Sequence, residues 1–88
     1  MAAYRILIKT SARKELEQVG PARSDRLRAV RRIEALADEP RPPGCEKLRG
    51  SEDRYRVRQG SYRVIYEVDD AARTVTVVKI GHRRDVYR

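Results

Sequence analysis

The stretch of sequence that decides the fold is Arg54-Tyr55-Arg56-Val57-Arg58-Gln59-Gly60-Ser61-Tyr62-Arg63. Polar and apolar side chains alternate on both sides of Gly60-Ser61, and this period of two is typical of half-buried β-strands. Gly60-Ser61 itself fits a two-residue type II′ turn, which places glycine at its first position. The stretch therefore predicts a β-hairpin with Gly60 and Ser61 at its tip.

The turn also fixes the register of the hairpin, because residues directly opposite each other share one face of the sheet. Arg58 then faces Arg63, and Arg56 projects on the same side. The opposite, buried face is expected to hold Tyr55, Val57, Val64 and Tyr66. Like charges directly opposite each other are destabilising, and the first strand of the hairpin contains no carboxylate. We therefore expect the arginine face to bind an anionic ligand.

The amino-acid composition also favours an anionic partner. Lys and Arg number 21 against 13 Asp and Glu, which gives the 88 residues a formal net charge of +8. All but four of the basic residues are arginine, and a guanidinium group makes planar, bidentate contacts with phosphate. A nucleic acid or an acidic protein is the expected partner.

Several other classes of protein do not fit the composition. Cys45 is the only cysteine, which excludes an internal disulfide, and one cysteine with one histidine cannot build a metal site from these ligands. We expect neither a metal nor a small-molecule cofactor. No apolar run approaches the roughly 18 residues of a membrane span, and the N-terminus lacks the apolar core of a signal peptide. A cytoplasmic protein without a membrane partner is expected.

The pattern over the whole chain predicts an α+β fold in a single domain, residues 1–88. An N-terminal strand is followed by a two-helix hairpin and then by an antiparallel three-stranded meander. The helices are expected to pack on one face of this small sheet. Strands are predicted over residues 4–9, 54–59, 62–68 and 74–80, and a short C-terminal tail over residues 81–88.

The two helices are predicted from their end signals. Ser11 is expected to cap a short first helix that ends near Val19 and is terminated by Gly20. Pro21 fits the first turn of a second helix, which must stop by Glu39. Apolar residues spaced by three form the expected buried stripe of this second helix, and they are Leu27, Val30, Ile33 and Leu36.

Three short motifs, in order along the chain, resemble those of a known family. They are Lys47-Leu48-Arg49-Gly50, Tyr62-Arg63-Val64-Ile65-Tyr66 and Gly81-His82-Arg83-Arg84-Asp85-Val86-Tyr87. With the order of the elements, they resemble the RelE branch of the RelE/ParE toxin superfamily over essentially the whole chain. The resemblance implies the toxin of a type II toxin–antitoxin system, a ribosome-dependent endoribonuclease that cuts translated messenger RNA. Its implied partners are a cognate RelB-type antitoxin and the ribosome with its message.

The same resemblance implies a set of catalytic residues, which are Arg56, Arg58, Arg63, Arg83 and Tyr87. Metal-free cleavage uses the ribose 2′-hydroxyl as nucleophile, so the site must remove a proton, stabilise charge on the phosphate and protonate the leaving oxygen. Arginine suits the second task, but its pKa above about 12 makes it a poor general base. Relatives often have lysine where this chain has Arg56 and Arg58. Either the base lies elsewhere, or catalysis rests on positioning and electrostatics.

Two further residues are candidates for proton transfer. Glu46 is a candidate base, because a related branch of the superfamily carries a catalytic glutamate just before the hairpin; the alternative is an ordinary loop carboxylate. His82 is a candidate acid, because its side chain titrates near neutral pH; the alternative is that it only positions the tail. Further contacts with RNA are expected from Lys47, Arg49, Arg54 and Arg84.

Alternatives remain open for the other residues and for the function. Arg56 and Arg58 belong to an ordinary solvated strand face if they pair with Glu67 or Glu52. Tyr87 either packs under the sheet or, as the resemblance implies, stacks on an unpaired base or orients the reacting phosphate. Two other functions fit the same fold, since a fold does not determine its function. One is a ParE-like inhibitor of DNA gyrase, and the other is a basic RNA-binding or antitoxin-binding protein that has lost catalysis.

Overall fold

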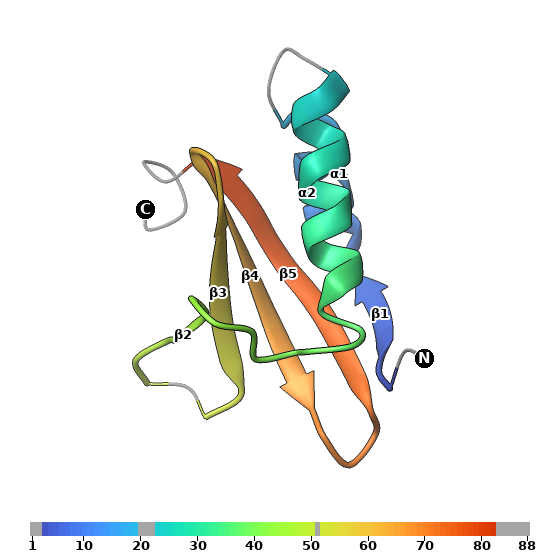
Figure 1. Cartoon of the computed structure of the whole chain (residues 1–88), viewed down its shortest axis with the longest axis vertical. Coiled ribbons are helices and arrows are strands. Elements are labelled where there is room, and N and C mark those ends of the chain that lie inside the picture. Colours follow the sequence, from blue (N-terminus) through green and yellow to red (C-terminus); the bar gives the residue numbers. More distant parts are fainter. Residues whose placement is uncertain (1–2, 20–22, 51, 83–88) are drawn as a thin grey trace.

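The computed structural model describes residues 3–19, 23–50 and 52–82, which are arranged as Figure 1 shows. The predicted helix-end signals Gly20 and Pro21 lie outside these residues. The helices and strands are β1 (Arg5–Ile8), α1 (Thr10–Glu17), α2 (Arg23–Ala35), β2 (Glu46–Lys47), β3 (Arg54–Gln59), β4 (Tyr62–Asp69) and β5 (Thr74–His82).

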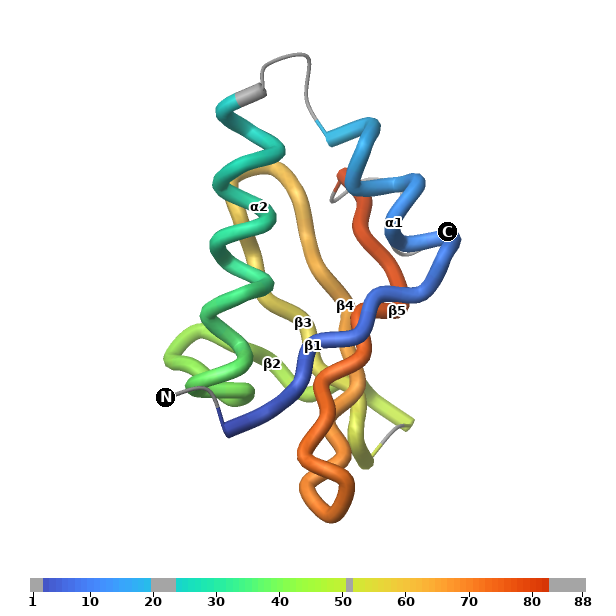
Figure 2. The backbone as a smooth tube through the Cα atoms, turned by 90° about the vertical axis from the view of Figure 1, so that its right-hand side faces the viewer, coloured from blue at the N-terminus to red at the C-terminus, as the bar shows by residue number. Residues whose placement is uncertain are grey.

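The strands form one mixed sheet in the order β1-β5-β4-β3-β2. β1 runs parallel to β5, and the other neighbouring strands are antiparallel. Both helices lie over the same face of the sheet (Figures 1 and 2). The predicted α+β fold, with an N-terminal strand, two helices and a three-stranded meander, is therefore confirmed. β2 was not predicted, because two residues are too few to show an alternating pattern.

The hydrophobic core lies between the helices and the sheet, and Tyr66 of β4 is at its centre. Tyr66 is fully buried, and its hydroxyl donates a hydrogen bond of 2.7 Å to the carbonyl oxygen of Pro40. Burial is the main reason why the pKa of Tyr66 is raised. The other large, fully buried side chains are Val19, Ile33, Leu36, Val57, Val64, Val75, Val77 and Ile80.

The apolar stripe of α2 differs from the prediction at its start. Leu27 is 44% exposed, whereas Ala29, Ile33 and Leu36 are at most 2% exposed. Residues spaced by three drift around a helix of 3.6 residues per turn, so Leu27, about two and a half turns before Leu36, points to the opposite side. Spacings of four and three, from Ala29 to Ile33 and on to Leu36, keep these side chains on one line.

α1 begins earlier than predicted. The residue before the helix is Lys9, and no side chain caps the first turn, so Ser11 is not the cap. The backbone N–H of Lys9 donates to the carbonyl of Val77 at 3.0 Å, and its own carbonyl accepts from the N–H of Arg13 at 2.9 Å. Lys9 thus makes both the last backbone hydrogen bond between β1 and β5 and the first one of α1. No other residue lies between the strand and the helix that could act as a separate N-cap.

α1 covers the edge of β5 that β1 leaves open. β1 pairs with β5 only as far as Ile8 opposite Val77. Beyond this point Glu15 of α1 accepts a hydrogen bond of 3.0 Å from the backbone N–H of Ile80, and its carboxylate lies 3.5 Å from Nζ of Lys79. The Glu15 side chain therefore takes the place of a neighbouring strand at this edge.

The loop between α2 and β2 is held by Arg41 as well as by Tyr66. The guanidinium of Arg41 donates to both carboxylate oxygens of Asp70, at 3.2 and 2.9 Å, and to the hydroxyl of Tyr55 at 2.9 Å. The hydroxyl of Tyr4 donates to the same carboxylate at 2.6 Å. The pKa of Asp70 is lowered, mainly because Arg41 hydrogen-bonds its ionised form. These bonds tie the loop to the turn between β4 and β5.

We predict that Tyr66→Phe lowers the free energy of unfolding by about 1–2 kcal/mol, because the ring still fills its site while the Pro40 carbonyl loses its partner. Urea unfolding followed by circular dichroism measures this change. Tyr4→Phe is the matched control, since it removes a tyrosine hydroxyl from an exposed hydrogen bond, and its effect should be smaller. Equal stability of Tyr66→Phe and the parent protein would contradict this account of the core.

Candidate functional site

The hairpin of β3 and β4 has the predicted register. Arg58 pairs with Arg63, and Val57 pairs with Val64. Gly60 has a φ of +60° and Ser61 does not have a positive φ, as a type II′ turn requires. Because residues alternate between the faces, the prediction that Arg56, Arg58 and Arg63 share one face is confirmed.

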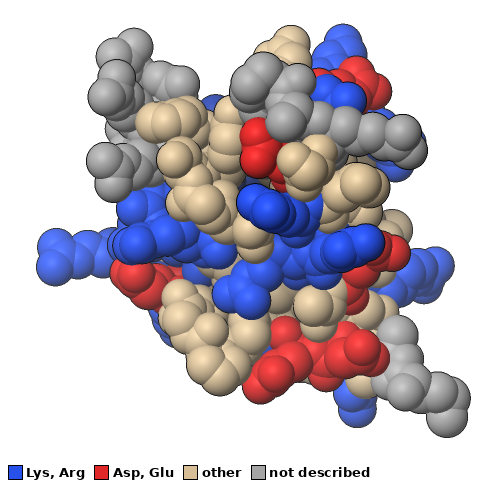
Figure 3. Space-filling model, turned by 45° about the horizontal axis from the view of Figure 1, so that its top comes forward, with Lys and Arg blue, Asp and Glu red and all other residues tan. Residues whose placement is uncertain are grey.

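These arginines line a cavity of about 290 Å³. Its lining residues are Arg32, Gly44, Glu46, Arg56, Arg58 and Arg63. We call the four arginines of this set the arginine cluster. Figure 3 shows Lys and Arg side chains gathered in a band across the middle of one face of the molecule, with Asp and Glu side chains around this band. With four guanidinium groups and one carboxylate, the lining of the cavity has an excess of positive charge and suits an anion.

Glu46 lies directly opposite Arg56, because β2 pairs with β3 at this point. The two side chains form a close ion pair. The pKa of Glu46 is lowered, first by the hydrogen bond from Arg56 and then by the positive charges of Arg56, Arg63 and Arg58. Glu46 is thus a carboxylate of the site, and its lowered pKa makes it a weaker base than an ordinary glutamate.

An ion pair with Glu67, as expected for an ordinary solvated strand face, is formed by Arg54 of β3. Glu67 pairs with Arg54, its direct neighbour across the strands, at 3.1 Å. Within the described residues, Arg56 forms its ion pair with Glu46 and not with Glu67 or Glu52. Arg54 therefore belongs to a surface ion pair at the far end of β3, away from the arginine cluster.

Arg32 is a site residue that was not among the predicted ones. It comes from α2, and its position among the other arginines of that helix is typical of a solvated side chain. β2 covers β3 only at Tyr55 and Arg56, so the outer edge of β3 is open beyond them and Arg32 contributes to the cavity there. The Nε atoms of Arg32 and Arg63 are buried and, within the described part of the chain, have no hydrogen-bond partner.

A buried donor without an acceptor costs free energy, because it has lost its bond to water. An anionic oxygen bound between Arg32 and Arg63 would supply the missing acceptor. The electrostatics and the unpaired donors of the cavity thus point to the same ligand, a compact anion such as a phosphate group.

The structure does not bring His82 into this cavity. β5 continues two residues further than predicted, so that His82 pairs with Tyr62 across the strands and shares its face. The two rings meet edge-on, with centroids 5.8 Å apart. His82 and Tyr62 line a separate cavity of about 250 Å³ together with Glu15 of α1 and Gln18, the residue that follows the helix. The expected tail therefore does not begin at Gly81, and His82 lies on the helix side of the sheet.

The remaining predicted residues fall into two groups. Lys47 and Arg49 line a cavity of about 610 Å³ that adjoins the arginine cluster. Arg83, Arg84 and Tyr87 lie outside the described residues, so their predicted roles stay predictions.

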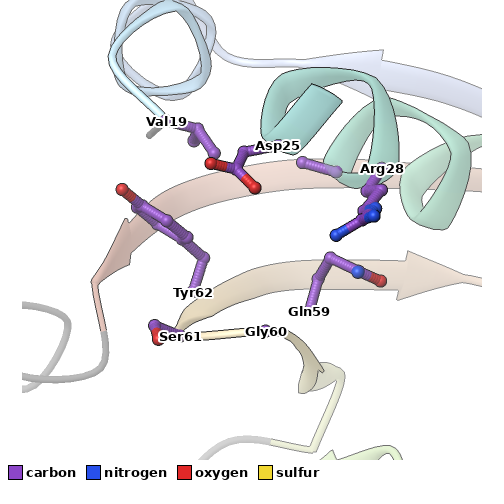
Figure 4. Close-up of a pocket in the computed structure, with 8 residues that line it drawn as sticks. Val19, Asp25, Arg28, Gln59, Gly60, Ser61 and Tyr62 are labelled. Atoms are coloured by element: carbon purple, nitrogen blue, oxygen red, sulfur yellow. The ribbon is translucent and has the colours of Figure 1, made fainter. Parts of the chain in front are cut away.

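A further cavity, of about 240 Å³, lies on the helix side of the sheet near the hairpin turn. Figure 4 shows Asp25 and Arg28 of α2 facing Gln59 and Tyr62 of the hairpin across this space. One acidic and one basic side chain give it no excess of charge. In the part of the chain that is described, no three His, Cys, Asp or Glu side chains are placed to hold a metal ion, and no helix is long and apolar enough to cross a membrane.

A two-helix layer on one face of a small mixed sheet, with an arginine cluster beside its hairpin, defines a small basic α+β domain. Comparison with known proteins identifies the family to which it belongs. The profile of the ParE toxin family, described as the toxin of the type II toxin–antitoxin system parDE, matches residues 6–87. The chain belongs to this family, and within the RelE/ParE superfamily it falls in the RelE branch.

Three relatives illustrate the RelE likeness. Toxin RelG of Mycobacterium tuberculosis is 32% identical, and the match covers 97% of each chain. The RelE chain of the archaeal RelE–RelB complex from Pyrococcus horikoshii superposes with a TM-score of 0.81 at 29% identity, covering 96% of this chain and 99% of that one. The Escherichia coli RelBE toxin–antitoxin complex gives a TM-score of 0.76 at 29% identity, covering 91% and 96%.

The ion pair of Glu46 and Arg56 leads to a prediction about pH. Because the pKa of Glu46 is lowered on folding, the pair stabilises the fold above the ordinary glutamate pKa, and this contribution is lost as the pH falls through the lower folded-state value. We expect Arg56→Ala to move the pKa of Glu46 back toward its ordinary value. A titration of the Glu46 carboxyl carbon by ¹³C NMR measures this shift.

Arg54→Ala is the matched control for this titration. It removes an arginine from the same strand, but one that pairs with Glu67. The titration of Glu46 should be the same in this variant as in the parent protein. An equally low pKa in Arg56→Ala would show that Arg56 is not the main cause.

Proposed function

We propose that this toxin is a ribosome-dependent endoribonuclease that cleaves translated messenger RNA in the cytoplasm without a metal ion. The observation that carries the proposal is the arginine cluster, with its excess of positive charge and the buried Nε atoms of Arg32 and Arg63, which have no hydrogen-bond partner among the described residues. The RelE likeness supports the same substrate.

In the proposed reaction the ribose 2′-hydroxyl loses its proton as its oxygen bonds to the adjacent phosphorus. The bond from phosphorus to the 5′-oxygen breaks and this oxygen takes up a proton, which gives a 2′,3′-cyclic phosphate and a 5′-hydroxyl. Negative charge builds up on the non-bridging oxygens of the phosphate in the transition state, and fixed donors aimed at this charge lower the barrier. Arg58, Arg63 and Arg32 supply these donors from three different elements, β3, β4 and α2. The sheet and the helix hold them in place before the RNA binds, so little reorganisation is needed.

In this mechanism proton transfer lowers the barrier less than the electrostatic stabilisation of the phosphate does. The lowered pKa of Glu46 argues against a strong general base, and its ion pair suits it to orienting Arg56. His82 lines a different cavity, so the leaving oxygen needs another proton donor. We assign Arg83 and Tyr87 as the further catalytic residues of this site. Lys47, Arg49 and Arg84 are assigned to binding of the RNA backbone.

The proposed inhibitor is a cognate RelB-type antitoxin. RelE toxins from Pyrococcus horikoshii and Escherichia coli have been solved as complexes with their RelB antitoxins. A toxin with a net charge of +8 and an exposed anion site is most simply silenced by an acidic segment that covers the arginine cluster.

We predict that Arg58→Ala and Arg63→Ala each reduce message cleavage about 10²-fold or more, as expected when a charged donor to the transition state is removed. Arg83→Ala and Tyr87→Ala should also abolish growth inhibition. Primer extension on a translated message, with and without induced expression, measures the cuts. Arg54→Ala is the control, since its partner Glu67 lies away from the cluster.

Two results would count against this function. Normal cleavage by a folded Arg58→Ala, Arg63→Ala double variant would remove the arginine cluster from catalysis. Intact messages together with supercoiling defects after induction of the parent toxin would favour inhibition of DNA gyrase.

The role of Arg32 leads to a separate prediction about binding. If Arg32 contacts phosphate, Arg32→Ala should reduce the slope of log affinity against log salt by about 0.7 for a single-stranded RNA oligonucleotide. Arg31→Ala is the matched control, because Arg31 precedes it in α2 but is exposed and does not line the cavity. Fluorescence anisotropy at several salt concentrations measures both slopes. Equal slopes in the two variants would assign Arg32 to the general positive charge of the surface.

A further inference from the structure

The cavity beside the arginine cluster differs from it in chemistry. It has a volume of about 610 Å³ and shares Glu46 and Arg56 with the cluster's own cavity, so the two spaces meet along this ion pair. Its other lining residues are Lys47, Leu48, Arg49 and Ile65. The volume lies within the range of small-ligand sites, roughly 300–1,000 Å³.

Two aliphatic side chains form the apolar part of this second cavity. Ile65 lies directly opposite Arg56, hence on the same face as the cluster, and is only 7% exposed. Leu48 is half-buried but is not among the residues that pack against the core. The backbone N–H of Leu48 donates to the carbonyl of Arg54 at 2.9 Å, which fixes this segment beside β3. The fold thus holds a leucine at the cavity without using it in the core.

The polar part of the cavity carries positive charge at its outer side. Lys47 and Arg49 are both exposed and line the same space. A purely apolar ligand would gain nothing from these cations, and a simple anion would gain nothing from Leu48 and Ile65. A nucleotide matches both parts, because it joins a flat base with apolar faces to a negatively charged backbone.

We propose that this second cavity binds the nucleobase next to the phosphate held by the arginine cluster. The inference rests on the proposed function, since it takes the substrate of the cluster to be RNA. The base packs against Leu48 and Ile65, and Lys47 and Arg49 contact the backbone that leads away from it. Because aliphatic side chains contact any base face, this site holds the RNA in register without strong selection of one base.

The test uses the full chain with methyl-labelled leucine and isoleucine. Inorganic phosphate, ribose 5-phosphate and the four nucleoside monophosphates AMP, GMP, CMP and UMP are titrated while NMR spectra are recorded. The monophosphates should shift the methyl signals of Leu48 and Ile65, whereas phosphate and ribose 5-phosphate should not. We expect the monophosphates to bind about fivefold more tightly than ribose 5-phosphate, which corresponds to roughly 1 kcal/mol.

Two variants separate a base site from a general effect on the fold. Leu48→Ala should remove the fivefold higher affinity for the monophosphates but leave the affinity for ribose 5-phosphate unchanged. Leu7→Ala is the matched control, since Leu7 is 44% exposed on β1 and should keep the gain. The methyl signal of Leu7 also serves as an internal control, because it should not move with any of the ligands.

The possible failures are distinguishable. Monophosphates and ribose 5-phosphate binding equally, with no movement of the Leu48 and Ile65 signals, would overturn the base site and leave the phosphate site standing. In that case the expected occupant of the cavity would be a protein segment, such as part of an antitoxin. If none of the ligands binds, the phosphate site proposed for the cluster fails and the base site fails with it.

Discussion

The pairing of Arg58 with Arg63 across β3 and β4 is the constraint on which the rest of the site depends. Two guanidinium groups directly opposite each other repel, so this arrangement persists only because the other face of the hairpin outweighs it. On that face Val57 and Val64 are almost completely buried, and the rings of Tyr55 and Tyr66 stack with centroids 5.9 Å apart. A shift of one residue would expose these side chains and bury the arginines. Burial of the apolar face of the hairpin thus fixes the position of the arginines on the other face.

The loop from α2 to β2 completes the site from the other side of β3. Its middle is held by the Tyr66 hydroxyl, which binds the Pro40 carbonyl, and by the bidentate contact of Arg41 with Asp70. From there the chain reaches Gly44 and Glu46, which lie beside the arginines of the hairpin. The hydrogen bond of Tyr66 to Pro40 therefore connects the centre of the core with the placement of the carboxylate that faces Arg56.

The sequence allowed a correct prediction wherever one short segment determines the local structure. The hairpin register followed from alternation around Gly60-Ser61, and it placed Arg56, Arg58 and Arg63 correctly. Arg32 was missed because its role depends on where α2 lies relative to an open strand edge, and no pattern within the helix records that distance. His82 was placed in a tail because Gly81 resembles a strand end, whereas pairing with β4 carries β5 through both residues.

The contact of Glu15 with the outer edge of β5 has a consequence for how the protein behaves at high concentration. An unpaired strand edge is a template on which another chain adds its own strand, and this is a common route to aggregation. Glu15 accepts the hydrogen bond of the Ile80 N–H on the stretch of β5 beyond β1, and the stretch of β3 beyond β2 carries Arg58. These two stretches thus discourage addition of an identical chain, the first by a carboxylate already in place and the second by repulsion between equal charges. A segment rich in Asp and Glu meets no such repulsion at β3, so the edge selects a partner of opposite charge over a second copy of the toxin.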